Sequence, residues 1–554
     1  MKNLWLILVL LLPSALLAHG GVVTSADPRA TSAGQEILRS GGSSTDAAIA
    51  MMLALSVVEP QSSGIGGGGF MVHHDAASGK IATIDGRETA PAALKPDRFL
   101  GADGKPKPFV DAFPGGQSVG IPGNVALAAL AHKKWGKLPW PKLFAPAIKL
   151  AEDGYSLSGA SYAWLHLIQN TDKDFPALQA LYWQNGAPKS PGSLIKNPAQ
   201  AKLLRAIAAQ GPRAFYTGTN ASAIIAAAKT ALKNPAIITR ADLTGYKAKE
   251  RAALCAPYRS YRVCSMGPPS SGGTTVLQIL GLLERFDMKT LGKDDPKSWH
   301  LLAEAMFLAY ADREKWLGDP DFVPVPIAGL LDKSYLSQRS ALISPDKSLE
   351  SYQAGTPPGA APRTAALSGE NYGTTHFVAV DGAGNITTMT STVEGPFGSQ
   401  LLANGAILNN ELTDFSFAPE QDGKPVANAP QAGKRPLSSM APVIVYDAQN
   451  KPILALGSAG GKRIIMHVAK TLIAVLDWGL PVRDAIAEPN IFIGGDAVLT
   501  EQGTKLDAMQ IPLARLGRTV VSSGLPSKVN AIERTPNGWR GTADPRGGGS
   551  ALDE

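Results

Sequence analysis

Thr374 is the residue of this sequence best placed for covalent chemistry, provided that the chain is cut just before it. It stands in the run Gly373-Thr374-Thr375-His376, where a glycine- and proline-rich stretch meets a strand-like run. A threonine at a new N-terminus carries a hydroxyl nucleophile and, on the same residue, an α-amine of ordinary pKa about 7.7–8.0 that can accept the proton. Cleavage before Thr374 would therefore give an amide hydrolase or acyltransferase, although threonine at a strand start also suits a purely structural role.

Two glycine-rich runs resemble nucleotide-binding loops but lack the surrounding elements that such loops need. Residues 64–69 contain the spacing G-x-G-x-x-G, yet a helix-like segment precedes them and a strand-like segment follows. We expect close backbone packing there, which only glycine permits. Residues 457–463 are too short for a phosphate loop and place Arg463 where a magnesium-binding hydroxyl is required. What remains is the pair Gly460 and Gly461 at a strand-to-helix junction, where backbone N–H groups can face a developing oxyanion.

Other reaction classes find little support in the sequence. It has no G-x-S-x-G and no H-E-x-x-H motif, and its eight histidines are scattered apart from the adjacent pair His73 and His74. A Ser/His/Asp hydrolase is therefore disfavoured, and nothing resembles a metal site. The net charge of +7 comes from dispersed lysines and arginines, which argues against nucleic-acid binding.

The elements that must position Thr374 can be predicted from the composition on either side of it. Residues 45–310 alternate alanine- and leucine-rich helical segments with glycine and proline breaks, and residues 355–369 have the composition of an exposed connector. The strands predicted beyond the connector are residues 375–380, 386–392, 442–446 and 453–456, the first two joined by a turn at 381–385, and a covering helix is predicted at 464–478. The chain thus predicts a mainly helical first part, a boundary in the connector, and then a sheet with packed helices.

The first eighteen residues are typical of a secretion signal. Lys2 precedes a short apolar run at residues 4–12, and residues 15–18 offer a small-residue cleavage site, so we expect the mature chain to begin near His19. A membrane anchor is the alternative, but this run is well below the roughly 20 residues that span a bilayer. The signal predicts a periplasmic or secreted protein with no stable membrane span after cleavage.

A second apolar run, residues 47–58, predicts a buried helix. It is preceded by the capping candidates Ser44 and Thr45 and followed by Pro60, which ends a helix.

The sequence contains two cysteines, Cys255 and Cys264, which flank a turn-like segment in a β-rich stretch. In an oxidising compartment they could pair across a hairpin, and two unpaired thiols are the alternative.

With these features in place, the sequence resembles the γ-glutamyltransferase (glutathione hydrolase) family of N-terminal nucleophile hydrolases over essentially the whole mature chain. The likeness is specific because many separated motifs match in order. In the first part they are GG at 41–42, TDAA at 45–48, SSGIGGG at 62–68, RETAP at 87–91 and PPSSGG at 268–273. In the second part they are TTH at 374–376, NN through DFS at 409–416, KRPLSSM at 434–440, GG at 460–461 and DPR at 544–546.

The resemblance implies an α+β fold, an αββα sandwich of the N-terminal nucleophile hydrolase type, made by a large subunit (19–373) and a small subunit (374–554) of one precursor. The roles that it implies by position are Thr374 as nucleophile, Thr392 as its hydrogen-bonding support, Gly460 and Gly461 as the oxyanion hole, Arg87, Ser438 and Ser439 as the site for the donor's α-carboxylate, and Glu411 and Asp414 as the site for its α-ammonium. A guanidinium for a carboxylate and acidic groups for an ammonium are coherent pairings. The implied reaction is attack on the γ-amide of glutathione or a related donor, with transfer of the acyl group to water, an amino acid or a peptide. It needs no metal or organic cofactor.

Two departures from the family pattern bear on substrate choice. Glu394 stands where many relatives place an asparagine that helps to hold the donor, and residues 417–433 form a short segment without the tyrosine of the lid found in some relatives. Because Arg87 is the only cation that the sequence assigns to a pocket with Glu394, Glu411 and Asp414, a donor with an α-ammonium is expected to fit better than a glutaryl donor. A cephalosporin-acylase-like or polyglutamyl-processing amidase remains the alternative, and a non-catalytic periplasmic binding protein is the alternative outside the enzymes.

Overall fold

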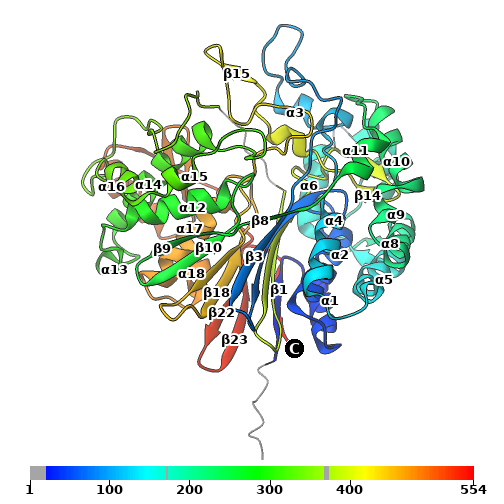
Figure 1. Cartoon of the computed structure of the whole chain (residues 1–554), viewed down its shortest axis with the longest axis horizontal. Coiled ribbons are helices and arrows are strands. Elements are labelled where there is room, and N and C mark those ends of the chain that lie inside the picture. The colour runs from blue at the N-terminus through cyan, green and yellow to red at the C-terminus, as the bar shows by residue number, and fades with distance from the viewer. Residues whose placement is uncertain (1–19, 170–171, 367–372) are drawn as a thin grey trace, which may run out of the picture.

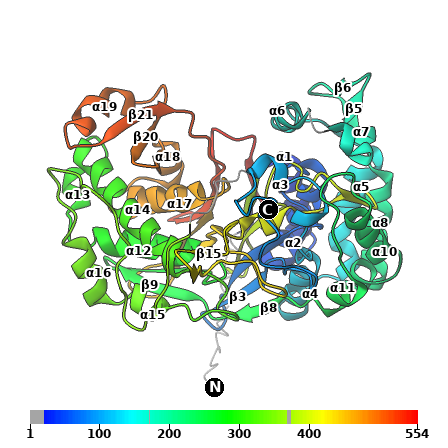
Figure 2. The same cartoon turned by 90° about the horizontal axis from the view of Figure 1, so that it is seen from above.

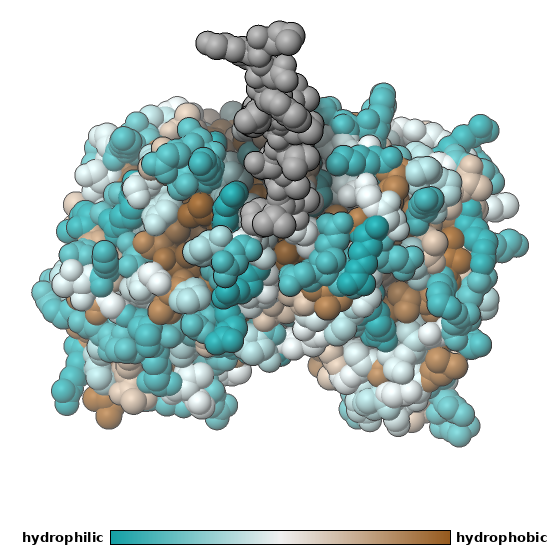
Figure 3. All heavy atoms as spheres, turned by 90° about the horizontal axis from the view of Figure 1, so that it is seen from below, coloured by the Kyte–Doolittle hydropathy of each residue, from teal (hydrophilic) through white to brown (hydrophobic). Residues whose placement is uncertain are grey.

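The computed structural model describes residues 20–169, 172–366 and 373–554. The expected secretion signal, the cleavage site near His19 and the connector residues 367–372 lie outside the described part. Within it, no helix is both long enough and apolar enough to cross a membrane. On the face shown in Figure 3, hydrophobic side chains form small patches among hydrophilic ones.

Two stacked antiparallel sheets form the centre of the molecule (Figure 1). The first has the order β24 (Ser550–Asp553), β1 (Val22–Ser25), β11 (Thr375–Val380), β12 (Ile386–Thr392), β2 (Gly68–Asp75), β3 (Lys80–Gly86) and β8 (Lys249–Arg251). The second has the order β23 (Gly538–Ala543), β22 (Asn530–Thr535), β18 (Pro452–Gly457), β17 (Val443–Tyr446), β10 (Tyr261–Ser265) and β9 (Leu254–Tyr258). Each sheet contains strands from before and after residue 374, so the two expected subunits share both sheets.

Helices cover the outer face of each sheet. On the first sheet lie α1 (Pro28–Arg39) and α2 (Ser44–Val58), and on the second lie α12 (Gly272–Leu283) and α17 (Arg463–Leu476), with α14 (Pro296–Trp316) packed against α12. Strand β11 shows how the sequence specifies these layers, since Phe377 and Ala379 pack with α2 while Val378 and Val380 pack in the core with the second sheet. Alternate side chains of a strand point to opposite faces, and here both faces are buried. The predicted αββα sandwich is confirmed.

The other elements surround this sandwich, and Figure 2 shows most of them gathered in two lobes. Helices of the first part are α3 (Phe109–Ala112), α4 (Asn124–Trp135), α5 (Ala145–Asp153), α6 (Gly159–Ile168), α7 (Pro176–Tyr182), α8 (Pro198–Gln210), α9 (Arg213–Tyr216), α10 (Gly218–Lys229), α11 (Arg240–Gly245), α13 (Met288–Leu291), α15 (Ile327–Leu330) and α16 (Lys333–Ser340). Later elements are the hairpin β15 (Glu420–Gln421) and β16 (Lys424–Pro425), helices α18 (Val482–Ala487) and α19 (Leu506–Ala514), and the small sheet β19 (Ile491–Gly494), β20 (Ala497–Glu501) and β21 (Thr519–Ser523).

Several local predictions can be compared directly with these elements. Strands β11 and β12 have the predicted bounds, and α2 is buried along its whole length. The predicted cap of α2 is wrong by one residue: Ser43 is the N-cap, because its side chain accepts from the backbone N–H of Asp46 while the Asp46 carboxylate accepts from the N–H of Ser43. Cys255 and Cys264 face each other across β9 and β10 and form a disulfide, so the paired alternative holds.

Candidate active site

Thr374 lies immediately before β11, beside Thr392, the last residue of β12. The hairpin register pairs Thr375 with Ser391, which brings the two threonines together at one end of the first sheet. Thr374 Oγ1 lies 2.6 Å from the carbonyl oxygen of Gly373, to which it donates, and 3.3 Å from Thr392 Oγ1. Thr392 Oγ1 also donates to the Gly373 carbonyl, at 2.5 Å. In the uncut chain, two hydroxyls therefore converge on the carbonyl of the bond expected to be cleaved.

Glycine is required on both sides of this arrangement. A Cβ on Gly67 would lie 1.9 Å from the carbonyl oxygen of Thr392, and one on Gly66 would lie 2.0 Å from that of Ile407. A Cβ on Gly373 would lie 2.2 Å from the carbonyl oxygen of Glu394. The close backbone packing expected for residues 64–69 is confirmed, and it fixes the backbone of Thr392.

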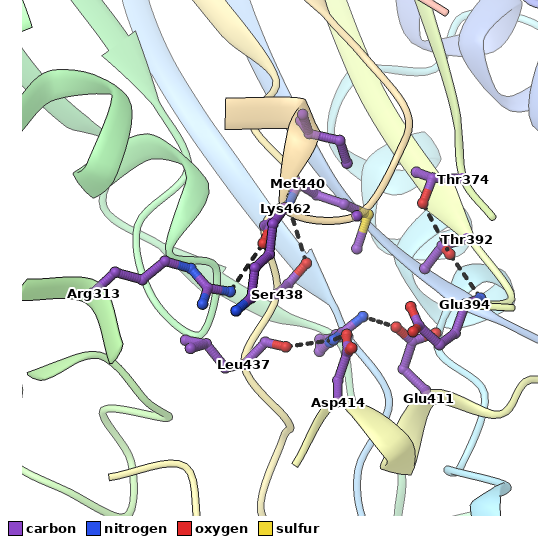
Figure 4. Close-up of a pocket in the computed structure, with 14 residues that line it drawn as sticks. Arg313, Thr374, Thr392, Glu394, Glu411, Asp414, Leu437, Ser438, Met440 and Lys462 are labelled. Carbon is purple, nitrogen blue, oxygen red and sulfur yellow. Dashed lines mark hydrogen bonds and ion pairs between the residues drawn. The ribbon is translucent and has the colours of Figure 1, made fainter. Parts of the chain in front are cut away.

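A pocket opens beside the two threonines (Figure 4). Its wall is made by Arg87, Arg313, Thr374, Thr392, Glu394, Glu411, Asp414, Leu437, Ser438, Ser439, Met440, Gly461, Lys462 and Ile464. The structure thus brings nine of the ten expected site residues to one cavity.

One side of the pocket combines Arg87 with three carboxylates. Arg87 follows β3 and is 1% exposed, and its guanidinium contacts Glu411 and, at 2.5 Å, Asp414, both from the short 3-10 helix Glu411–Asp414. Glu394 joins them from the loop after β12, with a φ of 80° that is unusual for a non-glycine residue. One oxygen each of Glu394, Glu411 and Asp414 lie within 4.8 Å of one another, a spacing suited to a cation. An ammonium fits this group as well as a metal ion would, since carboxylates accept charge-assisted hydrogen bonds.

Three buried glutamates in or behind this part of the pocket, Glu394, Glu411 and Glu88, hold protons more tightly than usual. Burial raises the pKa of Glu394 well above its ordinary value, and the neighbouring Asp414 and Glu411 raise it further. Burial also raises the pKa of Glu411, to about 7, although Arg87 opposes the shift. Behind them Glu88 is fully buried, and burial together with Glu411 raises its pKa as well. Such groups favour either a shared proton or the arrival of a positive charge.

The opposite side of the pocket carries two cations, so the expectation that Arg87 would be the only one is wrong. Arg313, near the end of α14, donates to Ser439 Oγ at 2.9 Å and to Ser271 Oγ at 2.8 Å. Lys462, just before α17, pairs with Glu314 at 2.8 Å. The sequence predicted neither cation as a pocket residue: Arg313 lies in a long helix about sixty residues before Thr374, and Lys462 falls within residues 457–463, whose spacing excludes a phosphate loop.

Gly460 and Gly461 connect β18 to α17, at the predicted strand-to-helix junction. Both have positive φ, 125° and 58°, a conformation that side chains rarely adopt. Gly461 lines the pocket, whereas Gly460 lies just outside its wall. A Cβ on Gly460 would come 3.5 Å from the ring of the buried His467, which the sequence had given no reason to place beside the site.

Comparison with known proteins agrees with this geometry. The family model described as Gamma-glutamyltranspeptidase matches residues 30–553. This chain belongs to the gamma-glutamyltranspeptidase family. It is 38% identical to a glutathione hydrolase proenzyme of Escherichia coli (strain K12), over 96% of this chain and 91% of that protein.

Two solved structures place the fold within the same group of enzymes. A cephalosporin acylase from Bacillus halodurans superposes with a TM-score of 0.85 at 26% identity, covering 96% of both chains. The gamma-glutamyltranspeptidase of Helicobacter pylori gives a TM-score of 0.58 at 36% identity, covering 61% of this chain and 96% of that one. As a member of the gamma-glutamyltranspeptidase family, the chain has the fold of an N-terminal nucleophile hydrolase, and its pocket lies where the two parts of the chain meet.

Proposed function

We propose that this protein is a γ-glutamyl hydrolase and transferase that acts on glutathione or related γ-glutamyl donors through an ester on Thr374. The observation that carries the proposal is the single pocket in which Thr374 and Thr392 stand next to Arg87 and three carboxylates. A γ-glutamyl group has a reactive carbonyl at one end and an ammonium and a carboxylate at the other. In the pocket, the carbonyl would lie at Thr374, and the ammonium and carboxylate would lie at the three carboxylates and Arg87.

The first step is self-cleavage between Gly373 and Thr374. The Thr374 hydroxyl attacks the Gly373 carbonyl carbon, the peptide C–N bond breaks, and the hydroxyl proton passes to the nitrogen that becomes the α-amine. Water then hydrolyses the resulting ester and restores the hydroxyl. The hydrogen bond from Thr392 to the Gly373 carbonyl supports this step, because a donor on that oxygen favours the negative charge that develops there, and the contact of Thr374 Oγ1 with the same carbonyl places the nucleophile beside the bond.

Turnover repeats the same chemistry on the donor. The hydroxyl of Thr374 attacks the γ-carbonyl, its proton passes through the free α-amine to the departing amine, and the γ-glutamyl ester remains on the enzyme. Water or the amino group of an amino acid or peptide then attacks the ester and releases Thr374. In this mechanism the N–H groups of Gly460 and Gly461 bind the oxyanion.

The donor's charged end has partners on two neighbouring surfaces. We assign its α-ammonium to Glu394, Glu411 and Asp414, and its α-carboxylate to Arg87 with the hydroxyls of Ser438 and Ser439. Arg87 already contacts two of the carboxylates, so an arriving ammonium would relieve the crowding of negative charge while Arg87 turns toward the donor's carboxylate.

The cleaved protein is expected to stay together as a large subunit, residues 19–373, and a small subunit, residues 374–554. Both sheets contain strands of each part, so separation would require the core to open. We further propose that the protein is periplasmic or secreted, on the strength of residues 1–18 and of the disulfide between Cys255 and Cys264, which is typical of oxidising compartments.

Intact-mass analysis of Thr374→Ala tests this assignment. The unmodified protein should give two chains, the smaller beginning at Thr374, while Thr374→Ala should remain one inactive chain because it lacks the nucleophile. Thr374→Ser keeps a hydroxyl and serves as the control that should still be cut. Normal cleavage of Thr374→Ala would overturn the proposal, and an uncleaved, inactive natural chain would favour the binding-protein alternative.

Acylase activity on donors without an α-ammonium is the second candidate, because the superposition with the cephalosporin acylase covers nearly the whole of both chains. The acidic side of the pocket weighs against it, since a glutaryl group would bring a further negative charge and no positive one.

A further inference from the structure

We propose that Lys462, supported by Arg313, forms a subsite for a carboxylate on the amine part of the substrate, that is, on the leaving group of the donor or on the acceptor. This inference rests on the proposed function, because it concerns the half of the substrate that is not the γ-glutamyl group. It predicts a preference for amine parts that carry a carboxylate.

The position of Lys462 follows from the loop that contains the glycine pair. Lys462 comes directly after Gly461, and both residues line the pocket. Its carbonyl oxygen accepts a hydrogen bond of 2.5 Å from the hydroxyl of Tyr310 on α14, which fixes the backbone at this point. Its side chain is 16% exposed, so the ammonium is partly desolvated but can be reached from the pocket.

Arg313 and Glu314 build the rest of this basic wall. Both Lys462 and Arg313 contact the Glu314 carboxylate, at 2.8 and 2.6 Å, and this shared partner holds the two cations beside one another. Figure 4 shows Arg313 and Lys462 on one side of the pocket, with Thr374, Thr392 and Glu394 on the other. The acidic side of the pocket thus includes the two threonines, while the basic side begins at Ser439, whose hydroxyl accepts from Arg313, and extends to Lys462.

The arrangement of the reacting amide assigns the basic side to the amine part. The two substituents of an amide carbonyl point in different directions from its carbon. If the glutamyl substituent extends toward Glu411 and Asp414, the substituent on nitrogen must point away from these two residues. In Figure 4, Lys462 lies on the part of the pocket wall that faces away from them.

A second hollow lies next to Lys462. It has a volume of about 550 Å³ and shares Lys462 with the active pocket. Four aromatic side chains contribute to its wall, namely Phe307, Tyr310, Tyr352 and Phe492. An amine part whose carboxylate binds Lys462 could place an apolar side chain against these rings.

Two donors that differ by a single carboxylate test the subsite. These are γ-glutamyl-4-nitroanilide, whose leaving group is neutral, and γ-glutamyl-3-carboxy-4-nitroanilide, whose leaving group is anionic. Lys462→Gln should lower kcat/KM for the carboxylated donor roughly tenfold more than for the neutral donor, the size expected for loss of a hydrogen bond between charged groups. Lys462→Arg keeps the charge and should retain most of the discrimination.

The controls separate this subsite from other roles of Lys462. Lys451→Gln makes the same change of charge at an exposed lysine in the turn between β17 and β18, and it should leave the ratio of the two donors unchanged. An equal loss on both donors would overturn the inference, since it would place Lys462 at the γ-glutamyl part, and so would no loss on either.

A measurement on the unmodified enzyme gives an independent check that does not depend on whether a variant matures. Transfer to glycylglycine should be more efficient than transfer to glycylglycine amide, because only the former has the carboxylate, and equal efficiency would contradict the subsite. Failure of the proposed function would look different: the unmodified enzyme would turn over neither anilide.

Discussion

The protonation of the acidic side of the pocket should make donor choice depend on pH in a defined direction. In the free enzyme, burial raises the pKa of Glu411 to about 7 and that of Glu394 well above its ordinary value, so the cluster holds at least one proton in mildly acidic solution. A donor with an α-ammonium must displace such a proton in order to bind the ionised carboxylates. A glutaryl donor gains nothing from that ionisation, because it brings no positive charge.

The magnitude follows from proton linkage. Displacing one proton changes relative binding by up to about tenfold per pH unit below the pKa of the cluster. Because the pKa of Glu411 is about 7, the ratio of kcat/KM for γ-glutamyl anilide to that for glutaryl anilide should rise with pH by up to about thirtyfold between pH 5.5 and 7, and then level off. Both donor carboxylates stay ionised and the donor ammonium stays charged over this range. Titration of the Thr374 α-amine changes kcat/KM equally for both donors, so it cancels in the ratio of the two kcat/KM values.

Initial rates for the two anilides across this pH range provide the assay, with Glu394→Gln as the informative variant. Glutamine keeps the shape of the side chain but cannot titrate, so this variant should flatten the rise and narrow the difference between the donors at pH 7.5. A ratio that does not change with pH would refute the linkage argument. If glutaryl anilide is the better substrate of the unmodified enzyme, the acylase assignment replaces the one proposed above.

Three further predictions concern the framework of the site. Thr392→Ala should slow self-cleavage or lower kcat, while each lost hydrogen bond costs only about 0.5–1.5 kcal/mol of stability. Denaturing gels over time measure the rate of self-cleavage. If both this rate and kcat are unchanged, Thr392 has no role in the site. Gly67→Ala should lower the melting temperature and delay self-cleavage, because its methyl group would lie 1.9 Å from the Thr392 carbonyl oxygen. Overpacking of this kind costs about 1–3 kcal/mol. Gly159→Ala adds a methyl group in open space and should change neither property. Cys255→Ser should reduce the free energy of unfolding by about 2–3 kcal/mol, which is the stabilisation expected from a disulfide that closes a short loop. It should leave kcat unchanged, because neither Cys255 nor Cys264 lines the pocket. Denaturant titration measures the first effect, and a kinetic assay measures the second.

Local patterns predicted the elements whose signals lie within a few residues. The turn at residues 381–385 and the alternation on either side of it specified β11 and β12, and with them the meeting of Thr374 and Thr392. The N-cap of α2 was misplaced because three adjacent residues, Ser43, Ser44 and Thr45, all suit a cap. The choice among them depends on Asp46, which stands three residues after Ser43 and completes the reciprocal pair.

Contacts between distant segments could not be predicted in this way. Arg313 on α14 and Lys462 just before α17 meet through Glu314 because both helices pack against α12. No spacing in the sequence encodes such a contact. The resemblance to the family implied positions for the donor's γ-glutamyl end, and it implied none for the amine part, to which we assign Lys462 and Arg313.

The position of β11 and β12 within the first sheet explains how the proposed cut before Thr374 would leave the fold intact. Both strands lie between β1 and β2, which belong to the large part, and their inward side chains are buried in both cores. The proposed cleavage would remove one covalent bond just before β11 but none of the strand pairing that holds Thr374. The hydroxyl of Thr392, which contacts the Gly373 carbonyl in the uncut chain, would remain beside Thr374 after the cut. In this proposal the framework that orients the precursor for its own cleavage also orients the nucleophile toward an external donor.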